Sequence, residues 1–188
     1  AALKGRPPGA LLVLALDVSN SMTGAKMQTA RDAASALLDA AALSAEGNHA
    51  ALVTFAHDAW IAQELTGDRA QLERGLAGLR PEAGTRLDRA IARALQALEG
   101  PTGRGSAGRA VLIVSDGGQT QAPDEALLAS RQARSRGIAV YTLAVGSDAD
   151  AALLESVAGA SGRAFGVENA FRPEAVIGAI ERDLASCP

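Results

Sequence analysis

The sequence predicts a doubly wound α/β domain, in which a mostly parallel sheet is covered by helices on both faces. Four apolar runs are bounded by polar or glycine-containing stretches: Leu11 to Leu16, Ala50 to Phe55, Ala110 to Val114 and Ile138 to Val145. Runs of this kind are typical of strands that are buried on both faces. Segments with helical apolar spacing lie between them, and this alternation requires crossover connections, which produce a parallel sheet.

Four helices are expected between and after these strands. Apolar stripes at helical spacing mark the first two. The stripes consist of Met27, Ala30, Ala34, Leu37, Leu38 and Ala41, and of Leu87, Ile91, Leu95 and Leu98. A third helix is predicted over Asp124 to Arg136, because Pro123 favours a helix start and Gly137 a helix end. The last helix begins near Pro173 and carries a stripe made of Val176, Ile177, Ile180 and Leu184.

One strand pair is an exception to the parallel arrangement. Only four residues separate Ala50 to Phe55 from a second extended run, Trp60 to Leu65. A link of this length is too short for a parallel crossover, so the second run is predicted to be an antiparallel edge strand. We expect Trp60 to serve in packing, and the turn residues His57 and Asp58 to be exposed without a functional role.

Length and composition limit the class of function. The 188 residues predict a single domain over 1–188, with a core over about 10–185. A net charge of −3 and an aromatic content of 3% argue against nucleic-acid binding, and no apolar run approaches the roughly 18 residues of a membrane helix. The single cysteine, Cys187, excludes an internal disulfide and a thiolate metal cluster. Because the sequence begins at Ala1, we expect it to be a mature or excised piece of a protein. The three glycines between Thr102 and Gly108 predict a loop there.

Oxygen-bearing side chains gather where the predicted strands end. Asp17, Ser19 and Ser21 follow the first strand at alternate positions, and Asp116 follows the third apolar run. Thr85 begins the second predicted helix. In doubly wound sheets, ligands bind outside the carboxyl ends of the strands, near the point where the strand order reverses. The five side chains are therefore expected to meet at this edge of the sheet.

The five predicted ligands are two carboxylates and three hydroxyls, which are hard donors. They suit Mg²⁺, with Mn²⁺ or Ca²⁺ as alternatives, better than they suit Zn²⁺. Asp17 and Asp116 neutralise the two charges of such a cation only if both carboxylates stay beside it. If one of them acts through water, the cation stays electrophilic towards a carboxylate from another molecule.

The segments around these residues resemble the von Willebrand factor A domains, also called integrin inserted-type domains. The matching segments are Asp17 to Met22, Gly84 to Leu87 and Val114 to Gly117. In the family, a metal-ion-dependent adhesion site combines an Asp-x-Ser-x-Ser motif with a distant Thr and a distant Asp. Order and spacing agree from about Ala10 to Leu184. Asn20 stands where the family often has Gly, and we expect Asn to tolerate positive φ there.

The resemblance implies a Rossmann-like fold and a metal site that performs no catalysis. The metal ligands that it implies are Asp17, Ser19, Ser21, Thr85 and Asp116. It also implies a protein partner whose Glu or Asp completes the metal shell, in adhesion or in assembly. A cell-surface or secreted location is favoured, and an intracellular location is left open.

Three other interpretations stand beside this one. Asp17 and Asp116 can be caps that end strands or start helices, and the hydroxyl residues can be turn or capping residues. The metal can be a structural element that joins loops within a larger protein. A metal-assisted hydrolase is the third alternative, although Ser19 stands where phosphatases with a similar sheet need a second acid, and no general base converges with the loops. The residues that flank the proposed metal and could touch a partner are Arg86, Gly118 and Gln119.

Overall fold

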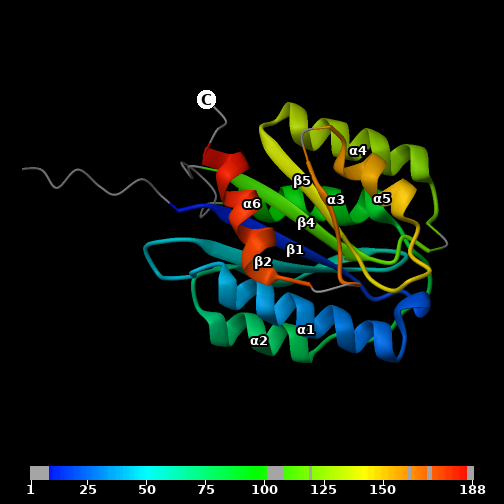
Figure 1. Cartoon of the computed structure of the whole chain (residues 1–188), viewed down its shortest axis with the longest axis horizontal. Helices are drawn as coiled ribbons and strands as arrows, with labels where there is room; N and C mark the ends of the chain where they lie inside the picture. The colour runs from blue at the N-terminus through cyan, green and yellow to red at the C-terminus, as the bar shows by residue number, and fades with distance from the viewer. Residues whose placement is uncertain (1–8, 101–107, 119, 161, 169–170, 186–188) are drawn as a thin grey trace, which may run out of the picture.

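The apolar runs form the strands of one sheet. The computed structural model describes residues 9–100, 108–118, 120–160, 162–168 and 171–185. Within this part, the strands are β1 (Leu11–Asp17), β2 (His49–Phe55), β3 (Ala59–Thr66), β4 (Arg109–Ser115), β5 (Ile138–Ala144) and β6 (Ala164–Gly166). Their order is β3-β2-β1-β4-β5-β6 (Figure 1). Of these strands, only β3 runs antiparallel to its neighbour, which confirms a mostly parallel sheet with one antiparallel edge strand.

Helices cover both faces of the sheet, as predicted. They are α1 (Ala25–Ala40), α2 (Arg69–Ala77), α3 (Leu87–Glu99), α4 (Pro123–Ser135), α5 (Ala151–Ala158) and α6 (Pro173–Ala185), and a 3₁₀ turn, η1, spans Asn20–Met22. Buried side chains of α1, α2 and α6 join the core on one face, and those of α3, α4 and α5 join the core on the other face. Among the described residues, no helix combines the length and the apolarity that crossing a membrane requires.

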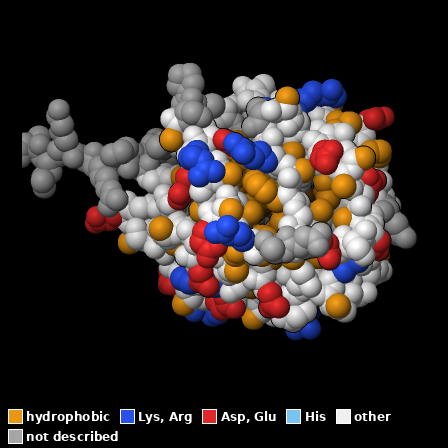
Figure 2. Space-filling view, viewed as in Figure 1, with side chains coloured by type: hydrophobic (Ala, Val, Ile, Leu, Met, Phe, Trp, Pro, Cys, Tyr) orange, Lys and Arg blue, Asp and Glu red, His pale blue; other side chains and the backbone are white. Residues whose placement is uncertain are grey.

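Strand β1 is the best buried element because strands flank it on both sides and helices cover both of its faces. Every one of its residues is buried. Leu14 and Leu16 contribute to the core that contains α1, whereas Val13 and Ala15 contribute to the core that contains α3. This alternation follows from the two-residue repeat of a strand. Figure 2 shows hydrophobic side chains near the middle of the face that carries α1 and α6, with charged side chains around them.

Several features differ from the sequence-based expectations. The elements α2, α5 and β6 are not predicted, because each is short and buries few residues; α2 buries only Leu72 and Leu76, and β6 has three residues. The expectation that Trp60 serves in packing is wrong, since this side chain lies on the edge strand and is 44% exposed. The predicted loop over Thr102 to Gly108 lies outside the described residues except at its last position, and Cys187 also lies outside them.

The strand order reverses at the carboxyl ends of β1 and β4. The chain passes from β1 to β2 on one side of the central strand, whereas β4 lies on its other side. Leu16 of β1 pairs with Val114 of β4, so the residues that follow the two strands emerge next to each other. The topology therefore brings Asp17 and Ser115 together at the reversal of strand order, where ligand sites of doubly wound sheets occur.

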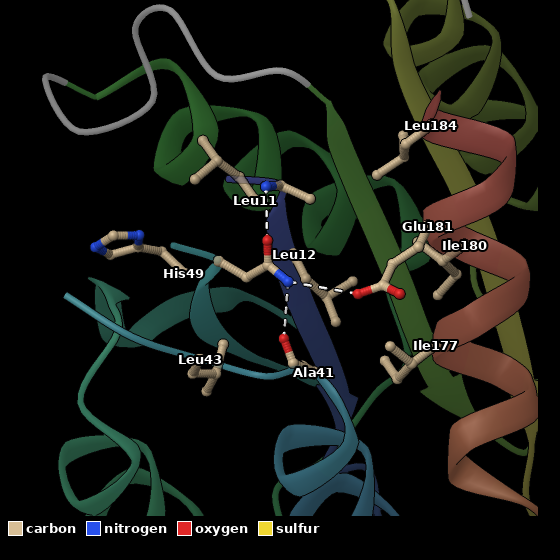
Figure 3. Close-up of a pocket in the computed structure, with 11 residues that line it drawn as sticks. Leu11, Leu12, Ala41, Leu43, His49, Ile177, Ile180, Glu181 and Leu184 are labelled. Carbon is tan, nitrogen blue, oxygen red and sulfur yellow. Dashed lines mark hydrogen bonds between the residues drawn. The ribbon is translucent and has the colours of Figure 1, made fainter. Parts of the chain in front are cut away.

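An apolar pocket lies at the opposite end of β1, where Leu12 of β1 and Ile177 of α6 are among its lining residues (Figure 3). Asn48 joins the elements around it. Its side-chain oxygen accepts a hydrogen bond from the N–H of Ala10, and its side-chain nitrogen donates one to the carbonyl of Ala41, both at 2.9 Å. Strand β1 spans about 20 Å at roughly 3.3 Å per residue, so this pocket is separate from the residues that follow the carboxyl ends of β1 and β4.

Leu14→Ala is expected to lower the free energy of unfolding by about 2 to 5 kcal/mol, because it leaves a cavity at a fully buried position of the central strand. Leu128→Ala is the matched control, since Leu128 is 51% exposed, and it should change this free energy by less than about 0.5 kcal/mol. Urea unfolding followed by circular dichroism measures both values. Equal losses in the two variants would contradict the position of Leu14 in the core.

Candidate metal centre

Asp17 ends strand β1 and is the most deeply buried of the predicted ligands, with no exposed side-chain surface. Its Oδ1 accepts a hydrogen bond from the backbone N–H of Ser19 at 2.8 Å, and its Oδ2 accepts one from the hydroxyl of Ser115 at 2.5 Å. Within the described part of the chain, no basic side chain pairs with it. Burial raises the pKa of the Asp17 carboxyl from its ordinary value of 3.8 to about 6, although the hydrogen bonds from Ser115 and Ser19 act in the opposite direction.

Ser19, Ser21 and Asp116 form a chain of hydrogen bonds between the loops that follow β1 and β4. The hydroxyl oxygens of Ser19 and Ser21 lie 3.0 Å apart, and the Ser21 hydroxyl donates to Oδ1 of Asp116 at 3.1 Å. The same carboxylate oxygen accepts a hydrogen bond from the backbone N–H of Gly118 at 2.8 Å. The carbonyl of Asp116 accepts another from the N–H of Asp150 at 2.7 Å, which adds the loop after β5. Three predicted ligands are therefore linked directly.

Thr85 belongs to a third loop, which contacts the other two through backbone hydrogen bonds. The Thr85 carbonyl accepts a hydrogen bond from the N–H of Gln121 at 2.9 Å, in the loop after β4. On the other side, Glu82 donates its N–H to the carbonyl of Val18 at 2.7 Å, directly after β1. Thr85 is 2% exposed. The three loops named by the sequence therefore converge, and Thr85 is buried where they meet.

The turn before Thr85 requires glycine. Gly84 has φ of +86°, and a Cβ at this position would lie 2.9 Å from the Cβ of His57. The N-cap residue of α3 is Arg86, so the Thr85 hydroxyl does not cap this helix. The capping interpretation of Thr85 is therefore wrong.

His57 and the adjacent Asp58 are exposed in the turn between β2 and β3, as expected.

The flanking residues are also placed by the structure. Asn20 begins the 3₁₀ turn η1 and does not adopt positive φ, so the tolerance expected of Asn is not needed. The guanidinium of Arg86 donates to both carboxylate oxygens of Asp88, each at 2.7 Å, and to Glu125 at 2.9 Å. Gln119 lies outside the described residues. The charge of Arg86 is therefore already paired with acids on its own side of the site.

Two further residues belong to the site, although the sequence does not identify them as site residues. The Ser115 hydroxyl donates a hydrogen bond to Asp17. Ser115 directly precedes the predicted ligand Asp116 in one of the matching segments, and this position could have identified it as a site residue. Lys26, in the first turn of α1, places its Nζ 2.8 Å from Oδ2 of Asp116 and 2.8 Å from Oδ1 of Asp148. No local signal links Lys26 to an aspartate 90 positions away.

The donor set at this site fits a hard divalent cation. Among the described residues, no group of three or more His, Cys, Asp or Glu side chains is arranged to hold a metal. The site instead offers two carboxylates together with hydroxyls, a combination that suits Mg²⁺ or Mn²⁺ better than Zn²⁺. A buried carboxylate without a basic partner carries a large desolvation cost, and a cation beside Asp17 would offset that cost.

Comparisons with known proteins agree with this architecture. A family model described as the von Willebrand factor type A domain matches residues 12–176. No curated protein is similar enough to match the chain. The fold is similar to that of an aerotolerance-related membrane protein from Bacteroides fragilis with multiple mutations to serines, at a TM-score of 0.78 and 22% identity, covering 95% of this chain and 100% of that chain.

Two other solved structures share the fold. The conserved hypothetical protein BatB from Bacteroides thetaiotaomicron has a TM-score of 0.77 and 22% identity, covering 94% of this chain and 98% of that chain. The manganese-loaded TRAP protein of Plasmodium vivax has a TM-score of 0.74 and 17% identity, covering 95% of this chain and 74% of that chain. At these identities the similarity establishes the fold alone.

The raised pKa of Asp17 predicts a pH-dependent cost in the metal-free protein. Because the folded pKa of about 6 lies above the ordinary 3.8, the folded state binds the extra proton between these values. The contribution of Asp17 to stability therefore falls as pH rises through this window. Asp17→Asn, which cannot ionise, should raise the melting temperature by several degrees at about pH 7.5 and by much less at about pH 4.5.

Thermal unfolding in EDTA at the two pH values measures this difference. Asp32→Asn is the control, because Asp32 is exposed on α1 and should give no such pH-dependent gain. A gain for Asp17→Asn that is the same at both pH values would show that the buried charge is not its cause.

Proposed function

We propose that this chain, which belongs to the von Willebrand factor type A domain family, is a divalent-metal-dependent protein-binding module for adhesion or assembly. The observation that carries the proposal is the fully buried carboxylate of Asp17, which has no basic partner among the described residues and lies beside the hydrogen-bonded group of Ser19, Ser21 and Asp116. A buried charge of this kind is costly unless a cation compensates it.

The proposed ligands are the five positions that the sequence named: Asp17, Ser19, Ser21, Thr85 and Asp116. We expect Mg²⁺, with Mn²⁺ or Ca²⁺ as alternatives, and the manganese-loaded structural relative supports a divalent metal. When bound, the metal supplies a positive charge that attracts a carboxylate. The chain prepares this site, since the Ser19 N–H and the Ser115 hydroxyl hold both oxygens of Asp17 in place.

A partner would reach the site over Ser21. Asp17, Ser19, Thr85 and Asp116 are each at most 2% exposed, whereas Ser21 is partly exposed. Mg²⁺ takes about six oxygen ligands, so five protein positions leave room for one more. A Glu or Asp side chain of a protein partner supplies such an oxygen together with a negative charge, and we propose that it completes the metal shell.

The two alternative functions are less well supported. Hydrogen bonds within the chain join the three loops, from Ser21 to Asp116 and from Gln121 to Thr85. A metal that only joined loops would therefore add little to the fold. A metal-assisted hydrolase lacks the second acid, because Ser19 stands at that position, and no general base converges with the loops.

We also propose that the protein acts at the cell surface or outside the cell. The support is the structural relative from Bacteroides fragilis, which is described as a membrane protein and is covered over its whole length by this chain. A module that binds acidic protein partners through a metal is suited to adhesion at such a surface.

Ser19→Ala and Thr85→Ala are each expected to weaken Mg²⁺ binding by about tenfold, because each removes a neutral oxygen donor while the fold is retained. Isothermal titration calorimetry measures the dissociation constants, and circular dichroism checks the fold. Ser156→Ala, which removes an exposed hydroxyl on α5, is the control and should leave Mg²⁺ binding unchanged. Unchanged binding in both site variants would refute the ligand assignment.

A minimal carboxylate, acetate, is expected to bind the parent protein only when Mg²⁺ is present. Amide NMR spectra titrated with acetate should then shift at Ser19 and Ser21, and chloride at equal ionic strength should not reproduce the shifts. Asp17→Ala should lose the acetate response while the protein stays folded. An acetate response that persists in EDTA would contradict the proposal, and a large fall in melting temperature in EDTA without acetate binding would favour the structural metal.

A further inference from the structure

Lys26 is the one basic residue in the described part of the chain that forms an ion pair with a proposed ligand. Its Nζ lies 2.8 Å from Oδ2 of Asp116 and 2.8 Å from Oδ1 of Asp148. The Asp116 side chain is 2% exposed, whereas that of Asp148 is 71% exposed. The pair with Asp116 is therefore largely shielded from water, and the second proposed carboxylate, Asp17, receives no such compensation.

Two parts of the fold hold Lys26 in this position. The residue belongs to the first turn of α1, and the loop after β5 closes over its stem. Gly146 in that loop has φ of +94°, and a Cβ there would lie 2.8 Å from Cε of Lys26. The same loop supplies Asp148, and the N–H of its Asp150 donates to the carbonyl of Asp116. The position of the ammonium group is therefore defined by contacts on more than one side.

The choice of lysine has a chemical consequence. Of the 18 basic residues, two are lysines, Lys4 and Lys26, and the others are arginines. An ammonium is a compact charge, whereas a guanidinium presents a planar fork that tends to bind both oxygens of a carboxylate. Lys26 contacts only Oδ2 of Asp116 and leaves the other oxygen to other partners.

The two oxygens of Asp116 consequently face different groups. Oδ1 accepts hydrogen bonds from Ser21 at 3.1 Å and from the N–H of Gly118 at 2.8 Å, on the side of the proposed ligands. Oδ2 faces the ammonium of Lys26. Asp116 can thus keep its ion pair while the oxygen beside Ser21 takes part in the metal site.

We propose that Lys26 is a positioning residue that holds Asp116 through Oδ2 and prevents it from fully neutralising the metal, which keeps positive charge available for the partner's carboxylate. This inference rests on the proposed metal-dependent binding. Asp17 and Asp116 together formally balance the charge of a divalent cation, and Lys26 adds one positive charge to that group. Asp148 offsets this charge only in part, because water screens an exposed carboxylate.

Lys26→Met tests the role of the charge, since Met keeps most of the stem and removes the ammonium. The Mg²⁺ dissociation constant is expected to fall by about tenfold, because a repelling charge is lost and Asp116 is released. The acetate dissociation constant of the Mg²⁺-loaded protein is expected to rise by about tenfold, because the site loses net positive charge. Lys26→Arg keeps the positive charge, but its planar fork tends to bind both oxygens of Asp116, so it should weaken Mg²⁺ binding rather than tighten it. Calorimetry and the NMR titration with acetate measure these constants.

Two further variants separate this role from a general effect of charge. Arg86→Gln removes a positive charge next to Thr85 that pairs with Asp88 and Glu125, and it should change both constants by less than about threefold. Asp148→Asn leaves Asp116 intact and removes the second partner of Lys26, so it should weaken Mg²⁺ binding and retain acetate binding. This variant also tests the proposal if Lys26→Met fails to fold.

The outcomes separate this inference from the proposed function. A parent protein that binds neither Mg²⁺ nor acetate would overturn both. A parent protein that binds both, with Lys26→Met leaving the two constants unchanged or moving them in the same direction, would overturn the role of Lys26 alone. An Arg86→Gln variant with effects as large as those of Lys26→Met would do the same.

Discussion

The site depends on one buried charge, the carboxylate of Asp17 at the end of the central strand. Strand β1 is flanked by β2 and β4 and covered by helices on both faces, so its last residue has no access to solvent. The Ser19 N–H and the Ser115 hydroxyl satisfy its oxygens, but a hydrogen bond from a neutral donor does not replace a counter-charge. The raised pKa of Asp17 expresses this deficit.

The two aspartates of the site have different hydrogen-bond and ion-pair partners. Asp17 receives only neutral donors, whereas Asp116 receives Ser21 and Gly118 on one oxygen and the ammonium of Lys26 on the other. The two carboxylates are of the same chemical type but differ in how far the protein compensates their negative charge. One needs a cation to compensate it, and the other is already partly neutralised, so a divalent metal between them would not be fully balanced.

Parallel strands explain why so many chain segments meet at this place. Since the carboxyl ends of β1, β4 and β5 share one edge of the sheet, the loops that follow them are neighbours, and backbone hydrogen bonds such as that from Asp150 to Asp116 join them. The opposite edge is apolar, and the pocket there is lined by residues of β1 and α6 such as Leu11 and Ile177.

The sequence by itself determined the fold class and predicted the five proposed ligands, because long apolar runs and acidic or hydroxyl residues at strand ends and before a helix are local patterns. It did not determine α2 and β6, which bury too few residues to leave a periodic signal, nor the exposure of Trp60, which depends on the edge position of β3. Only the tertiary structure decided that Ser115 supports Asp17 and that Lys26 pairs with Asp116. Those contacts join residues 98 and 90 positions apart, and their geometry exists only once the strands are aligned and the loop after β5 has closed over α1.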